Sequence, residues 1–94
     1  MKSLGFIEIP SVTAAIEALD TMCKTADVEF VTWERKLGGR LVTIIVQGDV
    51  SAVTEAVESA AKKAMKPCVY AVIANPHEET VRMVGISAEK FVGR

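Results

Sequence analysis

The sequence predicts a small α+β domain in which one antiparallel sheet carries two helices on the same face. Three features indicate this class: 50% of the 94 residues are hydrophobic, two segments place apolar residues three and four apart, and several short segments are rich in β-branched residues. A chain of this length forms one domain as a rule, and a chain this apolar buries a core. We expect a single domain over residues 1–94, with its core at 3–84 and a helical tail at 85–94.

The N-terminal segment predicts a strand followed by a helix. Ser3–Ile9 has the composition of a strand, and Pro10 ends it. Ser11 is suited to cap the next helix through its hydroxyl, and that helix is expected over Val12–Thr25. Its apolar positions follow helical spacing and are expected to be buried. They are Val12, Ala15, Ile16, Leu19, Met22 and Cys23.

The central segment predicts a β-hairpin and the second helix. Residues 28–35 and 41–47 are rich in β-branched and aromatic residues, and the Gly38-Gly39 pair between them predicts the turn of a hairpin. Asp49 supplies a cap for a helix that begins at Val50. The side of this helix expected to be buried carries Val50, Val53, Val57, Ala60, Ala61 and Ala64.

The last third predicts one more strand and a helical tail. Residues 68–74 are almost all apolar, which predicts burial on both faces or a place in the middle of the sheet. A short helix is expected at residues 77–84 and a second, small helix within residues 85–94.

The element order is therefore βαββαβ with a C-terminal helical extension, which predicts a ferredoxin-like sandwich. Both main helices are expected on one face of the sheet, so only the tail is left to cover the other face. A chain this short buries roughly 60–65% of its surface on folding. The remaining apolar side chains predict self-association.

The charge balance excludes several classes of partner. The chain has 11 basic and 12 acidic residues and a net charge of -1, so we expect no nucleic-acid binding. The basic run of Lys62, Lys63 and Lys66 is more typical of a helix C-terminus than of a phosphate site. No apolar run approaches the ~20 residues that a membrane span needs. We expect a soluble cytosolic chain that binds no membrane.

Few residues offer catalytic or metal-binding chemistry. Cys23 and Cys68 form no CxxC pair and are expected to be reduced core thiols. His77 is the one histidine, and its place at a helix start favours a structural cap or an interface residue over a general base. Ser11 and Thr13 have no base to activate them. We expect no catalytic residue, no cofactor and no metal.

The most informative segment is the turn Lys36-Leu37-Gly38-Gly39-Arg40. Adjacent glycines expose backbone N–H groups and let other chains approach closely, and flanking cations make such a loop attractive to anions. An ordinary hairpin turn explains the same residues, so both interpretations stay open on this evidence.

Three segments resemble bacterial microcompartment shell proteins of the single-domain, hexamer-forming type. They are LGFIEIPSVTAAIEALDTMCKTADV at residues 4–28, KLGGRLVTIIVQGDVSAV at 36–53 and ANPHE at 74–78. The resemblance covers about residues 4–84 and implies the BMC fold, a βαββαβ domain with a C-terminal helix. It also implies flat cyclic hexamers that pack edge to edge into a polyhedral shell, in the cytoplasm, around an encapsulated pathway.

The resemblance assigns positions to two sets of residues. It places Lys36, Leu37, Gly38, Gly39 and Arg40 at a central pore for small metabolites. It places Lys24, together with Asn75, Pro76 and His77, at the edge where neighbouring hexamers meet. The implied partners are copies of the chain itself, other shell proteins and the encapsulation peptides of cargo enzymes.

Two residues depart from the family pattern. Arg40 occupies the usual last-glycine position of the pore stretch, which is one residue longer here, so Gly38 and Gly39 are both candidates for the narrowest point. Asn75 stands where the family often has an arginine before Pro-His, which weakens the expected edge contact.

A different class remains as an alternative: a small ferredoxin-like regulatory or ligand-binding domain that senses a metabolite at a subunit interface. Such a domain would be a dimer or tetramer, whereas a shell tile would be a hexamer or a sheet. An enzyme would need a catalytic pair that the sequence does not offer.

Overall fold

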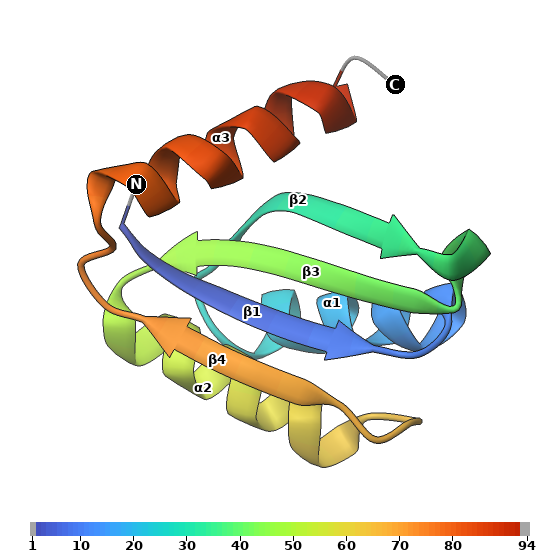
Figure 1. Ribbon diagram of the computed structural model, residues 1–94. Helices are drawn as coiled ribbons and strands as arrows, with labels where there is room; N and C mark the ends of the chain where they lie inside the picture. The colour runs from blue at the N-terminus through green and yellow to red at the C-terminus, as the bar shows by residue number, and fades with distance from the viewer. Residues whose placement is uncertain (1, 93–94) are drawn as a thin grey trace.

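The protein folds as a three-layer α+β sandwich in the computed structural model, which describes residues 2–92. One antiparallel sheet has the strand order β2-β3-β1-β4. Helices α1 and α2 cover one face, and α3 lies across the other (Figure 1). The elements in chain order are β1 (Ser3–Ile9), α1 (Val12–Thr25), β2 (Glu29–Lys36), the 3-10 turn η1 (Leu37–Gly39), β3 (Leu41–Gly48), α2 (Val50–Lys63), β4 (Val69–Ile73) and α3 (Glu78–Val92). The predicted ferredoxin-like fold class is confirmed.

The register of β1 determines where every loop lies. β1 pairs antiparallel with both β3 and β4, so that Ser3 lies opposite Gly48 and Leu4 lies opposite Ile73. The start of β1 therefore meets the ends of β3 and β4 at one end of the sheet. The β2–β3 hairpin lies at the other end.

Helix α1 begins as predicted, but its buried face differs from the expected one. The Ala14 N–H donates to the Ser11 hydroxyl oxygen at 3.0 Å, which confirms the serine cap. Ile16 remains 48% exposed, and Cys23 is exposed as well. Because two helices share one face of a narrow sheet, α1 buries small residues between α2 and the strands. The buried positions are Ala14, Ala15, Ala18 and Met22.

Two expectations for α2 and one for the cysteines need correction. Asp49 stands at the N-cap position, but its side chain makes no capping hydrogen bond. Val50 is 47% exposed because it lies in the first turn, at the end of the sheet. Cys23 is exposed on α1 and is not a core thiol, whereas Cys68 is half-buried and packs against the core.

Strand β4 is an edge strand, so the prediction of a mid-sheet or doubly buried strand was wrong. Among the described strands its one hydrogen-bonded neighbour is β1, and Val69, Tyr70 and Ile73 are exposed by 67%, 45% and 36%. The apolar composition of β4 thus does not reflect burial within a single chain.

The two short helices predicted for the C-terminal region are one continuous helix, α3. Gly85 lies in its interior without breaking it, because a single glycine costs a helix only about 1 kcal/mol. Phe91 packs edge-on against Phe30 and Trp33, with ring centroids 5.4 and 6.3 Å apart. Positions 93 and 94 of the predicted tail lie outside the described residues.

Gly5 sets the closest approach between β1 and α2. A Cβ atom at this position would lie 2.6 Å from Val53 Cγ1 and 2.9 Å from Val57 Cγ1. Valine side chains in a helix are stiff about χ1, so they cannot easily move aside. A glycine is therefore required here by packing.

We predict that Gly5→Ala lowers the free energy of unfolding by about 1–3 kcal/mol, since overpacking forces side chains and backbone to shift. Gly85→Ala is the matched control. A Cβ there meets no atom within 4 Å, so this change should stabilise the helix by roughly 0.5–1 kcal/mol. Urea denaturation at one fixed protein concentration measures both changes. Equal effects of the two substitutions would contradict the packing role of Gly5.

Candidate functional site

The five residues predicted for the pore loop form one exposed hairpin between β2 and β3. Leu37, Gly38 and Gly39 all have positive φ angles, of 55°, 64° and 89°. Left-handed backbone is costly for a residue that carries a Cβ, which explains the two glycines. Leu37 adopts it nevertheless, with its side chain 65% exposed.

The two glycines have different surroundings. A Cβ on Gly38 would meet no atom within 4 Å, whereas a Cβ on Gly39 would lie 3.1 Å from Val12 Cγ2. Gly39 thus packs against the start of α1, and Gly38 is the glycine that faces open space.

Hydrogen bonds to Leu37 and Arg40 hold the hairpin in this shape. The Arg40 backbone N–H and side-chain Nε–H both donate to the Leu37 carbonyl oxygen, at 3.3 and 3.0 Å. The Ser11 N–H donates to the Arg40 carbonyl oxygen at 3.2 Å, which ties the loop to the cap of α1. Arg40 therefore braces the loop from within, a role that the sequence did not indicate.

Cations surround this end of the molecule, which we call the hairpin end. Lys36 and Arg40 flank the glycines and are exposed. Lys66, which the sequence associated only with the end of a helix, lines the same shallow depression of about 450 Å³ as Gly38, Gly39 and Arg40. Exposed N–H groups with nearby cations favour anions and hydroxylated molecules electrostatically.

The residues predicted for the tile edge lie at the opposite end, which we call the turn end. The connection from β4 to α3 carries Asn75, Pro76 and His77, and Figure 1 shows it at the far end of the sheet from η1. Asn75 lines a depression of about 270 Å³ with Lys2, Gly48 and Asp49. Lys24 lies in the last turn of α1, which leads into the start of β2 at this same end.

Lys24 has a partner that the sequence analysis missed. Its ammonium lies 2.8 Å from an Asp20 carboxylate oxygen, one helical turn earlier, with the two side chains 75% and 59% exposed. The hydrogen bond that Lys24 donates to the Asp20 carboxylate, and then the negative charge of Asp20, raise the pKa of Lys24. An acidic residue four positions before a lysine is the favourable arrangement for such a pair, so the spacing was visible in the sequence.

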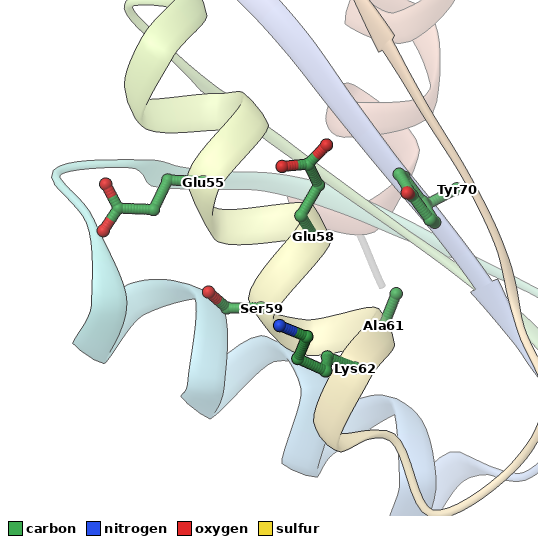
Figure 2. Close-up of a pocket in the computed structure, with 6 residues that line it drawn as sticks. All are labelled: Glu55, Glu58, Ser59, Ala61, Lys62 and Tyr70. Carbon is green, nitrogen blue, oxygen red and sulfur yellow. The ribbon is translucent and has the colours of Figure 1, made fainter.

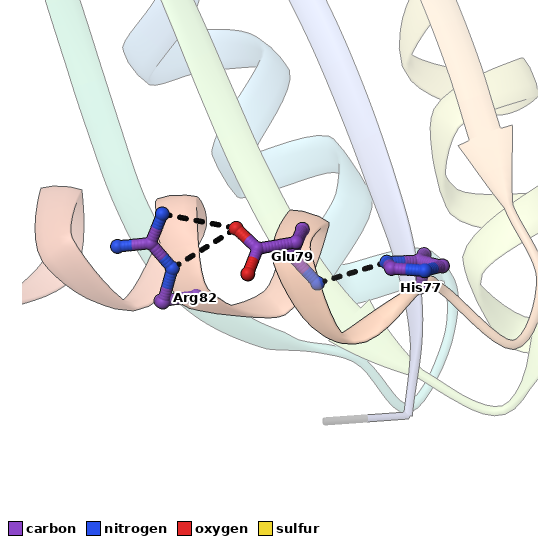
Figure 3. Close-up of polar contacts among 3 residues, drawn as sticks. All are labelled: His77, Glu79 and Arg82. Carbon is purple, nitrogen blue, oxygen red and sulfur yellow. Dashed lines mark hydrogen bonds and ion pairs between the residues drawn. The ribbon is translucent and has the colours of Figure 1, made fainter.

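His77 caps a helix, which is one of the two roles that its place in the sequence favoured. Figure 3 shows its Nδ1 accepting a hydrogen bond from the Glu79 N–H at 3.0 Å. Arg82 donates twice to one Glu79 carboxylate oxygen, at 2.9 and 3.1 Å. Asn75 has a positive φ of 49°, a conformation that asparagine tolerates better than most residues. Within residues 2–92, no hydrogen bond or ion pair joins Lys24 to this turn.

The described residues offer little chemistry for catalysis or metal binding. Among residues 2–92, no group of three His, Cys, Asp or Glu side chains could hold a metal ion. Burial and then the charge of Asp20 raise the pKa of the Cys23 thiol, which lowers its thiolate fraction and its reactivity. No helix in the described part of the chain has the length and apolar character to cross a bilayer.

Comparisons with known proteins agree on one family. A family model described as BMC domain matches residues 3–76. The bacterial microcompartment shell protein PduA of Citrobacter freundii is 43% identical over 91 residues, which cover 92% of this chain and 97% of that protein. The carboxysome shell protein CcmK2 of Synechococcus elongatus is 38% identical over 81 residues, covering 81% of this chain and 78% of that one.

A solved structure supports the same assignment. It is a microcompartments protein from Desulfitobacterium hafniense DCB, with a TM-score of 0.78 and 25% sequence identity over 93% of this chain. The match covers 48% of that protein, so this chain spans about half its length. Given a family model that matches most of its residues and relatives that align over nearly their whole length, the chain belongs to the BMC domain family.

Proposed function

We propose that this chain is a structural shell protein of a bacterial microcompartment, and that six copies form a ring with a central pore. The observation that carries this proposal is the separation of its two candidate regions. The glycine-containing, cationic hairpin lies at one end of the sheet, and Lys24 and the Asn75 turn lie at the other. A ring subunit needs this arrangement, with one end at the axis and the other at the perimeter.

The shape of the chain suits a tile. Its principal extents are 32 × 29 × 18 Å, so it is a thin slab. Its relatives are named as shell proteins of microcompartments and carboxysomes. A ring of slabs with their short dimension along the axis is flat, and flat rings can pack edge to edge into a sheet. BMC shell proteins are structural and are not enzymes.

The open groove between α3 and the sheet is the surface we assign to partners other than the chain itself. It has a volume of about 540 Å³, and its apolar lining includes Phe6, Ile45 and Ile86. An amphipathic encapsulation peptide of a cargo enzyme would bury its apolar side in such a groove. Other shell proteins would instead meet the turn end.

The oligomeric state tests the ring. Heterologous contacts close into rings when their rotation permits, so we predict a particle of six times the 10.1 kDa chain mass. Size-exclusion chromatography with light scattering at micromolar concentration measures it. A monodisperse monomer, or the dimer or tetramer of a metabolite-sensing domain, would contradict the proposal.

A substitution in the hairpin tests whether this loop lines the central pore. We predict that Gly38→Asn leaves the ring intact and narrows its central opening in a crystal structure, because Gly38 faces open space and asparagine tolerates a positive φ. Gly85→Asn, which adds the same side chain on α3, is the control and should leave the opening unchanged. An unaltered opening in the Gly38 variant would place the narrowest point at another residue.

Substitutions at the turn end test whether these residues form the contacts between neighbouring rings. Lysine stems cover apolar surface while their charge stays solvated, and charge-assisted hydrogen bonds are roughly twice as strong as neutral ones. We predict that Lys24→Ala keeps the ring but abolishes sheets in electron micrographs, and that Asn75→Arg strengthens them. Lys63→Ala, in the last turn of α2, is the matched control and should form sheets as the parent does. Sheets formed equally well by the Lys24 variant would show that this edge assignment is wrong.

A further inference from the structure

The two long sides of the slab have no role in the functions proposed so far. In the proposed ring the hairpin end faces the axis and the turn end faces the perimeter. Neighbouring copies then meet through the sides of the sheet, where β2 is one edge strand and β4 is the other. The inference below rests on that ring.

The β4 side carries an acidic cleft with an apolar border. The cleft has a volume of about 550 Å³ and lies between α2 and β4, and its lining includes Glu55, Glu58 and Tyr70. Figure 2 shows the Glu58 carboxylate on the same side of α2 as Tyr70, with the Lys62 ammonium directed away from it. Within residues 2–92, neither glutamate forms an ion pair.

The β2 side carries an arginine held in place by an aromatic ring. The Arg35 guanidinium carbon lies 5.4 Å from the centroid of the Trp33 ring. Cation–π contact restrains this side chain, so less conformational entropy is lost when it binds a partner. Arg35 is exposed and, within the described chain, has no carboxylate partner.

The strand register puts Arg35 and Tyr70 on the same face of the sheet and within two residues of each other along the strand direction. Arg35 lies opposite Val42 on β3, and Val42 lies opposite Ile9 on β1. Tyr70 lies opposite Ile7 on the other side of β1. Ile7 and Ile9 are two residues apart, which is roughly 7 Å along a strand.

The faces agree because Ile7, Ile9 and Val42 all belong to the buried core beneath α1 and α2. Directly paired residues project to the same face of a sheet. Arg35 and Tyr70 therefore both project toward the helical face, at opposite edges. Rotation about an axis beyond the hairpin end brings such positions on successive copies together.

We infer that Arg35 of one copy enters the α2–β4 cleft of the next copy and pairs with Glu58, beside the Tyr70 ring. A guanidinium and a carboxylate form two parallel N–H···O bonds, and a half-enclosed cleft screens them less than open solvent does. The contact is heterologous, since a different patch is used on each copy, and a closing rotation makes it a ring. The exposed Tyr70 ring of β4 is then covered by the neighbour.

Charge reversal tests the pair in the full-length chain. Glu58→Arg and Arg35→Glu should each raise the concentration at which the ring dissociates by about tenfold or more, because each change places like charges together. The variant that carries both reversals should dissociate at a concentration close to that of the parent, because the opposite charges are paired again. Glu89→Arg, an exposed carboxylate on α3, is the matched control and should leave dissociation unchanged. Sedimentation velocity over a dilution series measures all four variants, and circular dichroism confirms that each is folded.

A double-mutant cycle with neutral glutamine substitutions tests the same pair if a charge reversal prevents folding. Glu58→Gln and Arg35→Gln should each raise the concentration at which the ring dissociates. The double variant should dissociate at no higher concentration than the more strongly affected single variant, because both changes remove the same interaction. The Arg35–Glu58 pair would be contradicted if the single variants dissociated at the same concentration as the parent. It would also be contradicted if the effects of the two substitutions multiplied in the double variants. Neither result would contradict the ring itself. A parent chain that forms no ring would instead overturn the proposed function.

Discussion

The central constraint in this protein is the double antiparallel pairing of β1, with β3 on one side and β4 on the other. This pairing sends the β2–β3 hairpin to one end of the sheet and the β4–α3 turn to the other. Strands of seven and eight residues separate these ends by roughly 25 Å. A chain of 94 residues therefore presents two chemically different ends, and the proposed roles in a ring follow from that separation.

Packing on the helical face makes this pairing rigid. Gly5 lets α2 approach β1 until Val53 and Val57 fill the space where a side chain would stand. The small residues of α1 allow a second helix beside it. The apolar residues Val69 and Ile73 of the edge strand β4 stay exposed because they project to the opposite face, where α3 packs against β2. A monomer that exposes an apolar edge strand is prone to self-association. The way the core is packed in one chain therefore favours association with other copies.

The sequence predicted the local elements well because their signals are local. The spacing of apolar residues and the Ser11 cap gave α1 its observed bounds, Val12–Thr25. Prediction from the sequence failed where contacts between distant segments or between chains determine which residues are buried. The apolar composition of residues 68–74 indicated a central strand, although sequence cannot distinguish burial by the same chain from burial by another. Gly85 suggested a break that the packing of Phe91 against β2 overrides. The positions of the hairpin and turn residues became visible only through strand order and register.

Distances between identical labels on different copies test the orientation of the chain in the ring most directly. Cys23 is exposed near the turn end, so with Cys68→Ser it accepts a spin label in place. Leu37→Cys, with both native cysteines replaced by serine, places the same label at the hairpin. Double electron–electron resonance on the assembled protein should give clearly shorter separations for position 37 than for position 23. Separations at position 37 that equal or exceed those at position 23 would contradict a ring with the hairpin at its axis.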